Sequence, residues 1–149
     1  MEHDIRAAAD GLFLKREELR AVRNMGWSIG AHTVSHRCLN SLDEAEQVAE
    51  INQSKRELEE LLGDRVDGFA YPFGGVDAYD TNTERLARDA GYRVAFALRP
   101  KVVLCGSVNR WAIPRFSVGQ SDTMSLLRSR LELARLFGRR ESPRESSRA

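Results

Sequence analysis

The sequence has 149 residues, 42% hydrophobic and 30% charged, which is enough for one globular domain and excludes a collagenous or wholly disordered chain. The 23 basic and 22 acidic side chains nearly cancel, so neither nucleic acid nor an anionic membrane is an expected partner. Two cysteines are too few for a disulfide framework, and no apolar run approaches a membrane span. Residues 1–10 are charged where a signal peptide is apolar, so as written the chain starts in the cytoplasm.

Helical and strand-like segments alternate along the chain, which predicts an α/β fold with a parallel sheet and helical crossovers. Apolar residues at helical spacing predict helices over 15–25, 42–62, 83–90 and 123–137. Short apolar runs predict strands over 27–31, 66–71, 92–97 and 113–118, with 101–108 as a strand or buried loop. Residues 138–149 are expected to be a disordered tail.

Several residues are expected to set the ends and buried faces of these helices. Ser41 and Glu44 have capping-box spacing ahead of the longest helix, and Gly63 ends it. Asp122 is expected to cap the last helix. The buried stripe of the longest helix is predicted to be Ala45, Val48, Ile51, Leu58 and Leu62.

Two histidines, His32 and His36, follow the first predicted strand. They can share a metal ion only if the backbone between them curls, because an extended strand would place them about 13 Å apart. Alone, such a pair is a weak signal, and two ordinary polar histidines explain it more simply. Cys38, Asp77 and Asp80 are further candidate ligands, for which a free thiol and a solvated turn are the simpler interpretations.

The sequence Tyr71-Pro72-Phe73-Gly74 closes the next predicted strand. The proline keeps the preceding residue extended, and the glycine permits a turn that other residues resist. The backbone N–H of Phe73 could then serve as an oxyanion donor in a cleft, although for this motif alone an ordinary strand-ending loop is the better explanation. Both motifs fall at the carboxyl ends of predicted parallel strands, where ligands bind in such folds.

Together, the two motifs resemble those of the NodB-type polysaccharide deacetylases, also called carbohydrate esterase family four. His32-Thr33-Val34-Ser35-His36 resembles that family's His-(Ser/Thr)-x-x-His metal motif. Phe69-Ala70-Tyr71-Pro72-Phe73-Gly74 resembles its substrate-groove motif without the usual leading arginine. The resemblance runs from about residue 12 to residue 118 and includes segments 54–63, 89–92 and 114–118.

The resemblance implies a partial or distorted (β/α) barrel over residues 1–137, incomplete at its N-terminus. It also implies a metal-dependent hydrolase that removes N- or O-linked acetyl groups from a polysaccharide or acetylated glycan. His32 and His36 would bind a divalent metal, with zinc expected, and the backbone N–H of Phe73 would stabilise the oxyanion. Tyr71, Pro72 and Gly74 would shape the substrate groove. Members of this family commonly act outside the cytoplasm, so the resemblance leaves the location open.

Two parts of the family's catalytic pattern have no counterpart in this sequence. The Asp-Asp motif, source of the general base and the third metal ligand, is absent, and no histidine follows His36 to act as the general acid. Because a general base is worth roughly 10²–10⁴-fold, we expect low or no activity from this chain alone. Arg115 either adds positive charge near the cleft or forms an ion pair at an edge strand.

Three interpretations therefore remain open. The chain is the carboxyl part of a deacetylase domain, through a wrong gene start or a truncation. Alternatively, it is a catalytically inactive carbohydrate-binding or interaction module that keeps the fold and the groove. A third expectation is self-association, because a barrel without its first strands leaves an unpaired sheet edge.

Overall fold

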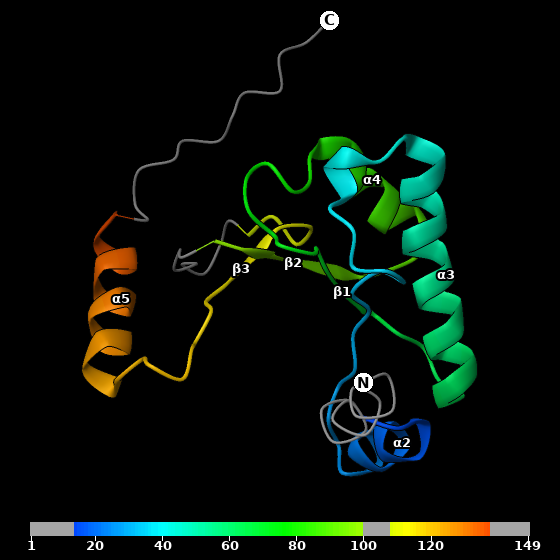
Figure 1. The fold of residues 1–149 in the computed structure, drawn as a ribbon, viewed down its shortest axis with the longest axis horizontal. Helices are drawn as coiled ribbons and strands as arrows, with labels where there is room; N and C mark the ends of the chain where they lie inside the picture. Colours follow the sequence, from blue (N-terminus) through cyan, green and yellow to red (C-terminus); the bar gives the residue numbers. More distant parts are fainter. Residues whose placement is uncertain (1–13, 100–107, 138–149) are drawn as a thin grey trace, which may run out of the picture.

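A three-stranded parallel sheet lies at the centre of the computed structural model, which describes residues 14–99 and 108–137 (Figure 1). Its strands are β1 (Gly68–Ala70), β2 (Val94–Leu98) and β3 (Ile113–Arg115), in the order β1-β2-β3. Gly68 pairs with Val94, and Phe96 with Ile113. Ala31 adds one parallel bridge to Phe69 on the other side of β1. The predicted α/β fold with a parallel sheet is confirmed.

The described helices lie close to their predicted positions. They are α2 (Arg16–Asn24), the short 3₁₀ helix η1 (Leu39–Ser41), α3 (Glu44–Leu62), α4 (Thr81–Asp89) and α5 (Met124–Phe137). In Figure 1, α3 and α4 stand together beside the sheet, whereas α5 lies at the opposite side of the molecule. None of the described helices combines the length and the apolar character that crossing a membrane requires.

One face of the sheet carries the core. Alternate strand residues Phe69, Ala95 and Ala97 are buried and pack in one cluster with Ile51 of α3 and Leu86 of α4. The residues between them point to the opposite face, where Gly68, Val94 and Phe96 line a concavity of about 760 Å³. The sheet is therefore covered by helices on one side. A partial barrel is consistent with this arrangement. Closure of the barrel and self-association through a sheet edge both stay predictions.

The predicted start of α3 was wrong by two residues. The helix is capped by Asp43, whose carboxylate accepts the Glu46 N–H at 2.8 Å, while the Glu46 carboxylate accepts the Asp43 N–H at 3.3 Å. Ser41 lies in η1, and its hydroxyl donates to the carbonyl of Cys38 at 2.7 Å. The serine thus belongs to a 3₁₀ turn, and the same capping-box chemistry occurs two residues later, at Asp43 and Glu46. Gly63 ends α3 in the left-handed conformation, as predicted.

Other local predictions were also wrong. Segment 27–31 makes only the Ala31 bridge within the described residues, and the Trp27 side chain is 67% exposed. Ala45 is exposed, so the buried stripe of α3 is narrower than predicted. Thr123 caps α5, because its hydroxyl accepts the Leu126 N–H at 3.2 Å. Asp122 instead accepts the N–H of Gly119 at 2.8 Å. Residues 101–107 and the predicted tail lie outside the described part of the chain.

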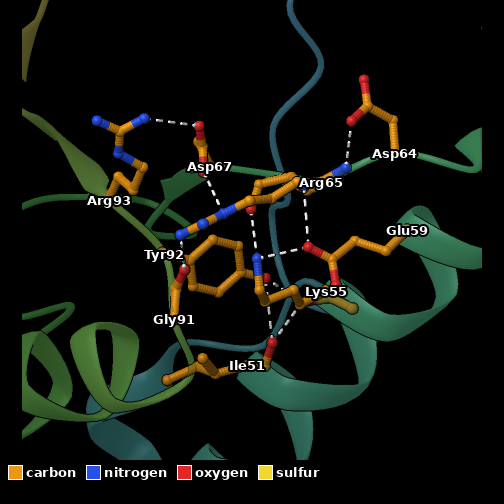
Figure 2. Close-up of polar contacts among 11 residues, drawn as sticks. Ile51, Lys55, Glu59, Asp64, Arg65, Asp67, Gly91, Tyr92 and Arg93 are labelled. Carbon is orange, nitrogen blue, oxygen red and sulfur yellow. Dashed lines mark hydrogen bonds and ion pairs between the residues drawn. The ribbon is translucent and has the colours of Figure 1, made fainter.

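A polar cluster joins α3 to the amino end of β1 (Figure 2). Lys55 forms an ion pair with Glu59 at 2.7 Å and also donates to the carbonyl of Val66. Glu59 accepts the Val66 N–H at 3.0 Å, and the Lys55 ammonium lies 4.7 Å from the Tyr92 ring centroid. Nearby, Asp67 forms ion pairs with two exposed arginines, Arg65 and Arg93. These contacts fix the amino end of the sheet against the helix layer.

Candidate functional site

The two sequence motifs meet at the carboxyl ends of neighbouring extended segments. Nδ1 of His32 lies 2.7 Å from the carbonyl oxygen of Ala70, the last residue of β1. The rings of His32 and His36 are 4.8 Å apart between centroids and nearly perpendicular. The ring of His36 lies 5.0 Å from that of Phe73, again edge to face. The structure thus brings together three of the predicted site residues.

The backbone between the two histidines curls, as metal sharing would require. Thr33 and His36 have φ angles of 64° and 58°, in the left-handed region that L residues rarely adopt. The Thr33 hydroxyl accepts the His36 N–H at 3.0 Å, which offsets part of the cost of this conformation. The curl, with the rings 4.8 Å apart, replaces the separation of about 13 Å expected in a strand.

A carboxylate from α3 holds this curled segment from outside. Glu50 accepts the backbone N–H groups of Val34 and Ser35 at 2.8 and 2.9 Å, and its other oxygen accepts the Ser35 hydroxyl. Burial acts to raise the pKa of Glu50, but the hydrogen bonds from Ser35 and Val34 outweigh it and leave this pKa below its usual value. Sequence reasoning missed Glu50, because its only signal is its place beside the buried residue Ile51.

The contacts of His32 favour its neutral form and select one tautomer. A carbonyl only accepts, so in the neutral ring Nδ1 carries the proton and Nε2 has the lone pair that a cation would need. Partial burial lowers the pKa of His32, the bond to Ala70 opposes this, and the nearby His36 and Arg115 lower it further. A histidine whose second nitrogen is fixed by a carbonyl is the usual form of a metal ligand.

The loop after β1 also has a left-handed backbone. Phe73 and Gly74 have φ angles of 59° and 60°. A Cβ at Gly74 would lie 2.5 Å from the backbone nitrogen of Leu98, which donates to the Gly74 carbonyl at 2.8 Å, so only glycine fits here. The Phe73 side chain is 59% exposed beside His36. Its backbone N–H donates to no residue in the described ranges, so it is available to an acceptor.

Tyr71 and Pro72, the first residues of this loop, are fully buried and anchor it in the core. The Tyr71 hydroxyl donates to the carbonyl of Trp111 at 2.9 Å, and its ring stacks on Tyr79 at 4.1 Å. Arg115 donates to the Tyr71 carbonyl at 3.0 Å and pairs with no carboxylate of the described residues, so the ion-pair interpretation finds no support there. Tyr71 and Pro72 therefore shape the surface through the loop that they hold, and their part in a groove stays a prediction.

The side chains present fit two ligand positions of a metal site. Within residues 14–99 and 108–137, no group of three His, Cys, Asp or Glu side chains could hold an ion. Asp80 is occupied as the N-cap of α4, where it accepts the Thr83 N–H at 2.8 Å. The Cys38 thiol lies 3.9 Å from the carbonyl of Ala78. His32 and His36 thus supply donor chemistry that zinc accepts, and a third ligand is not found beside them in the described part.

Comparison with known proteins identifies relatives of both sequence and fold. The Bacillus subtilis protein named "Putative polysaccharide deacetylase YxkH" is 28% identical over 87 residues, which cover 58% of this chain and 30% of that protein. The Streptococcus pyogenes deacetylase PplD, solved in complex with acetate, has a TM-score of 0.69 at 20% identity, over 79% of this chain and half of that one. BC0361, a polysaccharide deacetylase from Bacillus cereus, has a TM-score of 0.66 at 24% identity. That match covers 79% of this chain and 36% of BC0361.

The structural matches show a shared fold, and this chain spans at most half the length of these three relatives. The family model described as polysaccharide deacetylase matches residues 4–95, more than half of the chain. The matched region contains both histidines, the loop after β1 and the helix that holds Glu50. On the matched sequence and the shared fold, this chain belongs to the polysaccharide deacetylase family.

Proposed function

We propose that this chain forms the two-histidine part of a metal-dependent site that hydrolyses N- or O-linked acetyl groups on a polysaccharide. The observation that carries the proposal is the meeting of His32, His36 and Phe73 at the carboxyl ends of adjacent segments. Parallel α/β sheets bind ligands at this end, and the family relationship supplies the reaction class. The substrate is an acetylated glycan.

Each residue of the site has a separate part in this proposal. His32 and His36 hold a divalent metal, with zinc suited to imidazole ligands. When bound, such an ion lowers the pKa of water and polarises a carbonyl oxygen. The free backbone N–H of Phe73 donates to the oxygen of the acetyl carbonyl as negative charge develops there. Its exposed ring gives the glycan an apolar surface beside His36.

The test is acetate release by the full chain from an N-acetylated chito-oligosaccharide and, separately, from O-acetylated xylan. We expect slow, zinc-dependent release from one of them, because the described residues add no third metal ligand to the two histidines and the sequence has no Asp-Asp pair to supply the base. His32→Ala and His36→Ala should each reduce release to the rate without protein. Zinc binding, measured by competition with a coloured chelator, should weaken in both variants.

His3 is the natural control, because it is the only other histidine of the chain and lies 29 positions before His32. His3→Ala should change neither zinc binding nor acetate release. The proposal fails if the wild-type chain binds no zinc and releases no acetate from either substrate, or if release persists unchanged in His32→Ala.

A second candidate is a glycan-binding module without catalysis. The absence of a third metal ligand within the described ranges favours it. In that case the chain binds an acetylated glycan through the Phe73 surface, and binding persists in chelator while no acetate appears. Phe73→Ala should then abolish binding, whereas loss of binding in chelator would count against this second function.

A further inference from the structure

We infer that Glu50 is a positioning residue for the histidine pair: its carboxylate fixes the segment between His32 and His36 and thereby sets where the His36 imidazole lies. This inference rests on the proposed function, in which the two rings share a metal. It concerns a residue outside both sequence motifs, on the helix that follows them.

The hydrogen bonds of the Glu50 carboxylate all fall on the segment between the two histidines. Its three hydrogen bonds all go to Val34 and Ser35, two of the three residues between the histidines. One carboxylate oxygen accepts both backbone N–H groups, and the other accepts the Ser35 hydroxyl. These donors lie on consecutive residues of a curled segment, so one carboxylate determines the path of the chain from one ring to the next.

The helix gives this carboxylate a fixed origin. Ile51, the next residue of α3, is fully buried in the core, and the buried Gln47 side chain donates to the carbonyl of Leu42 at 3.1 Å. Glu50 therefore connects an exposed loop to a helix that is packed on the core. Without Glu50, the N–H groups of Val34 and Ser35 would lose their acceptor. The bond from the His36 N–H to the Thr33 hydroxyl would then hold the left-handed backbone alone, and that backbone would relax toward negative φ.

The two rings should respond differently to loss of this contact. His32 has an independent anchor, the bond from Nδ1 to the Ala70 carbonyl at 2.7 Å, and it is partly buried. His36 is exposed. Its described contacts are the Thr33 hydroxyl at its own N–H and edge-to-face contacts of its ring with His32 and Phe73, none of which is a hydrogen bond of the imidazole. Removing the Glu50 carboxylate should therefore displace His36 and leave His32 largely in place.

The experiment compares Glu50→Ala, Glu50→Gln and wild type in two measurements. Zinc affinity, by competition with a coloured chelator, should fall by roughly 10- to 100-fold in Glu50→Ala, the range found when a partner of a ligand is removed. Zinc affinity should fall less in Glu50→Gln, because the amide oxygen still accepts hydrogen bonds from the loop. In the metal-free chain, the imidazole NMR signals of His36 should move, while those of His32 change little.

Glu60→Gln is the matched control, since it removes a carboxylate from an exposed position of the same helix. It should alter neither measurement, and circular dichroism should show that all variants keep their helix content. If Glu50→Ala does not fold, Glu50→Gln carries the test alone.

The inference is overturned if Glu50→Gln and every folded Glu50 variant leave the His36 signals and zinc affinity as in wild type. It is also overturned if His32 moves as much as His36, which would indicate a general loosening. A wild-type chain that neither binds zinc nor releases acetate would end the proposed function, and the metal-free His36 signals would still decide the role of Glu50.

Discussion

The two ends of the parallel sheet differ in how their polar groups are arranged. At the amino end, Lys55, Glu59 and Val66 satisfy one another in ordinary backbone conformations. At the carboxyl end, Thr33, His36 and Phe73 have left-handed backbones without being glycine, and the rings of His36 and Phe73 are open to solvent. At the amino end the polar groups satisfy one another. At the carboxyl end the imidazoles and the Phe73 N–H are left available to a ligand.

This difference separates stability from function along the same strands. The amino end can contribute to folding because its charges are paired with each other and with the backbone. The carboxyl end holds strained residues, which persist only where their surroundings fix them. Here these surroundings are of two kinds: a carboxylate from α3 for the histidine loop, and buried packing for the loop after β1.

The largest effect is expected from Gly74→Ala. The new Cβ would meet the Leu98 nitrogen at 2.5 Å, and φ is 60°, so the variant combines a backbone clash with left-handed strain. We expect a loss of about 3 kcal/mol in the free energy of unfolding, measured by urea denaturation. Gly63→Ala isolates the strain, because φ there is 64° with open space around it, and should cost about 1 kcal/mol. Equal effects of the two would contradict the assigned clash.

At the amino end, Lys55→Met should have a smaller but clear effect. The Lys55 side chain is 12% exposed, and its loss leaves the Val66 carbonyl and the Glu59 carboxylate without their cation. We expect a loss of about 2 kcal/mol in the same denaturation experiment, with zinc affinity unchanged. Arg93→Met is the control, because its side chain is 67% exposed and its pair with Asp67 is 3.5 Å long. It should cost less than about 0.5 kcal/mol. A larger loss of stability in Arg93→Met than in Lys55→Met would contradict the role assigned to Lys55.

Acid should weaken both ends through two different carboxylates. Hydrogen bonding from Lys55 lowers the pKa of Glu59, and the loop hydrogen bonds outweigh burial and lower that of Glu50. Because both folded pKa values lie below the unfolded ones, the stability they contribute is present above about pH 4.3 and is lost as the pH falls through each folded pKa.

The amide proton shifts of Val66 and of Val34 and Ser35 should report these two titrations by NMR, with midpoints below about 4.3. In Glu50→Gln the shifts of Val34 and Ser35 should no longer titrate, while Val66 should behave as in wild type. A titration of Val34 that survives the substitution would show that another group holds the loop.

Much of the fold was predictable because it depends on local patterns. Apolar spacing located the four predicted helices, and alternation of helices and strands gave the parallel sheet. The errors occurred where two local solutions compete. Ser41 and Asp43 both suit a helix start, and an intervening 3₁₀ turn decided for the aspartate. Segment 27–31 is apolar enough for a strand, but only Ala31 finds a described partner.

The sequence by itself determined the family, the two histidines and the need for a curl between them, because these follow from residue types at fixed short spacings. Only the tertiary structure decided that His36 meets Phe73, that Arg115 supports the Tyr71 carbonyl, and that Glu50 holds the histidine loop. The physical reason is separation along the chain: contacts over 15 to 44 residues depend on how helices pack on a sheet, and no local pattern records them.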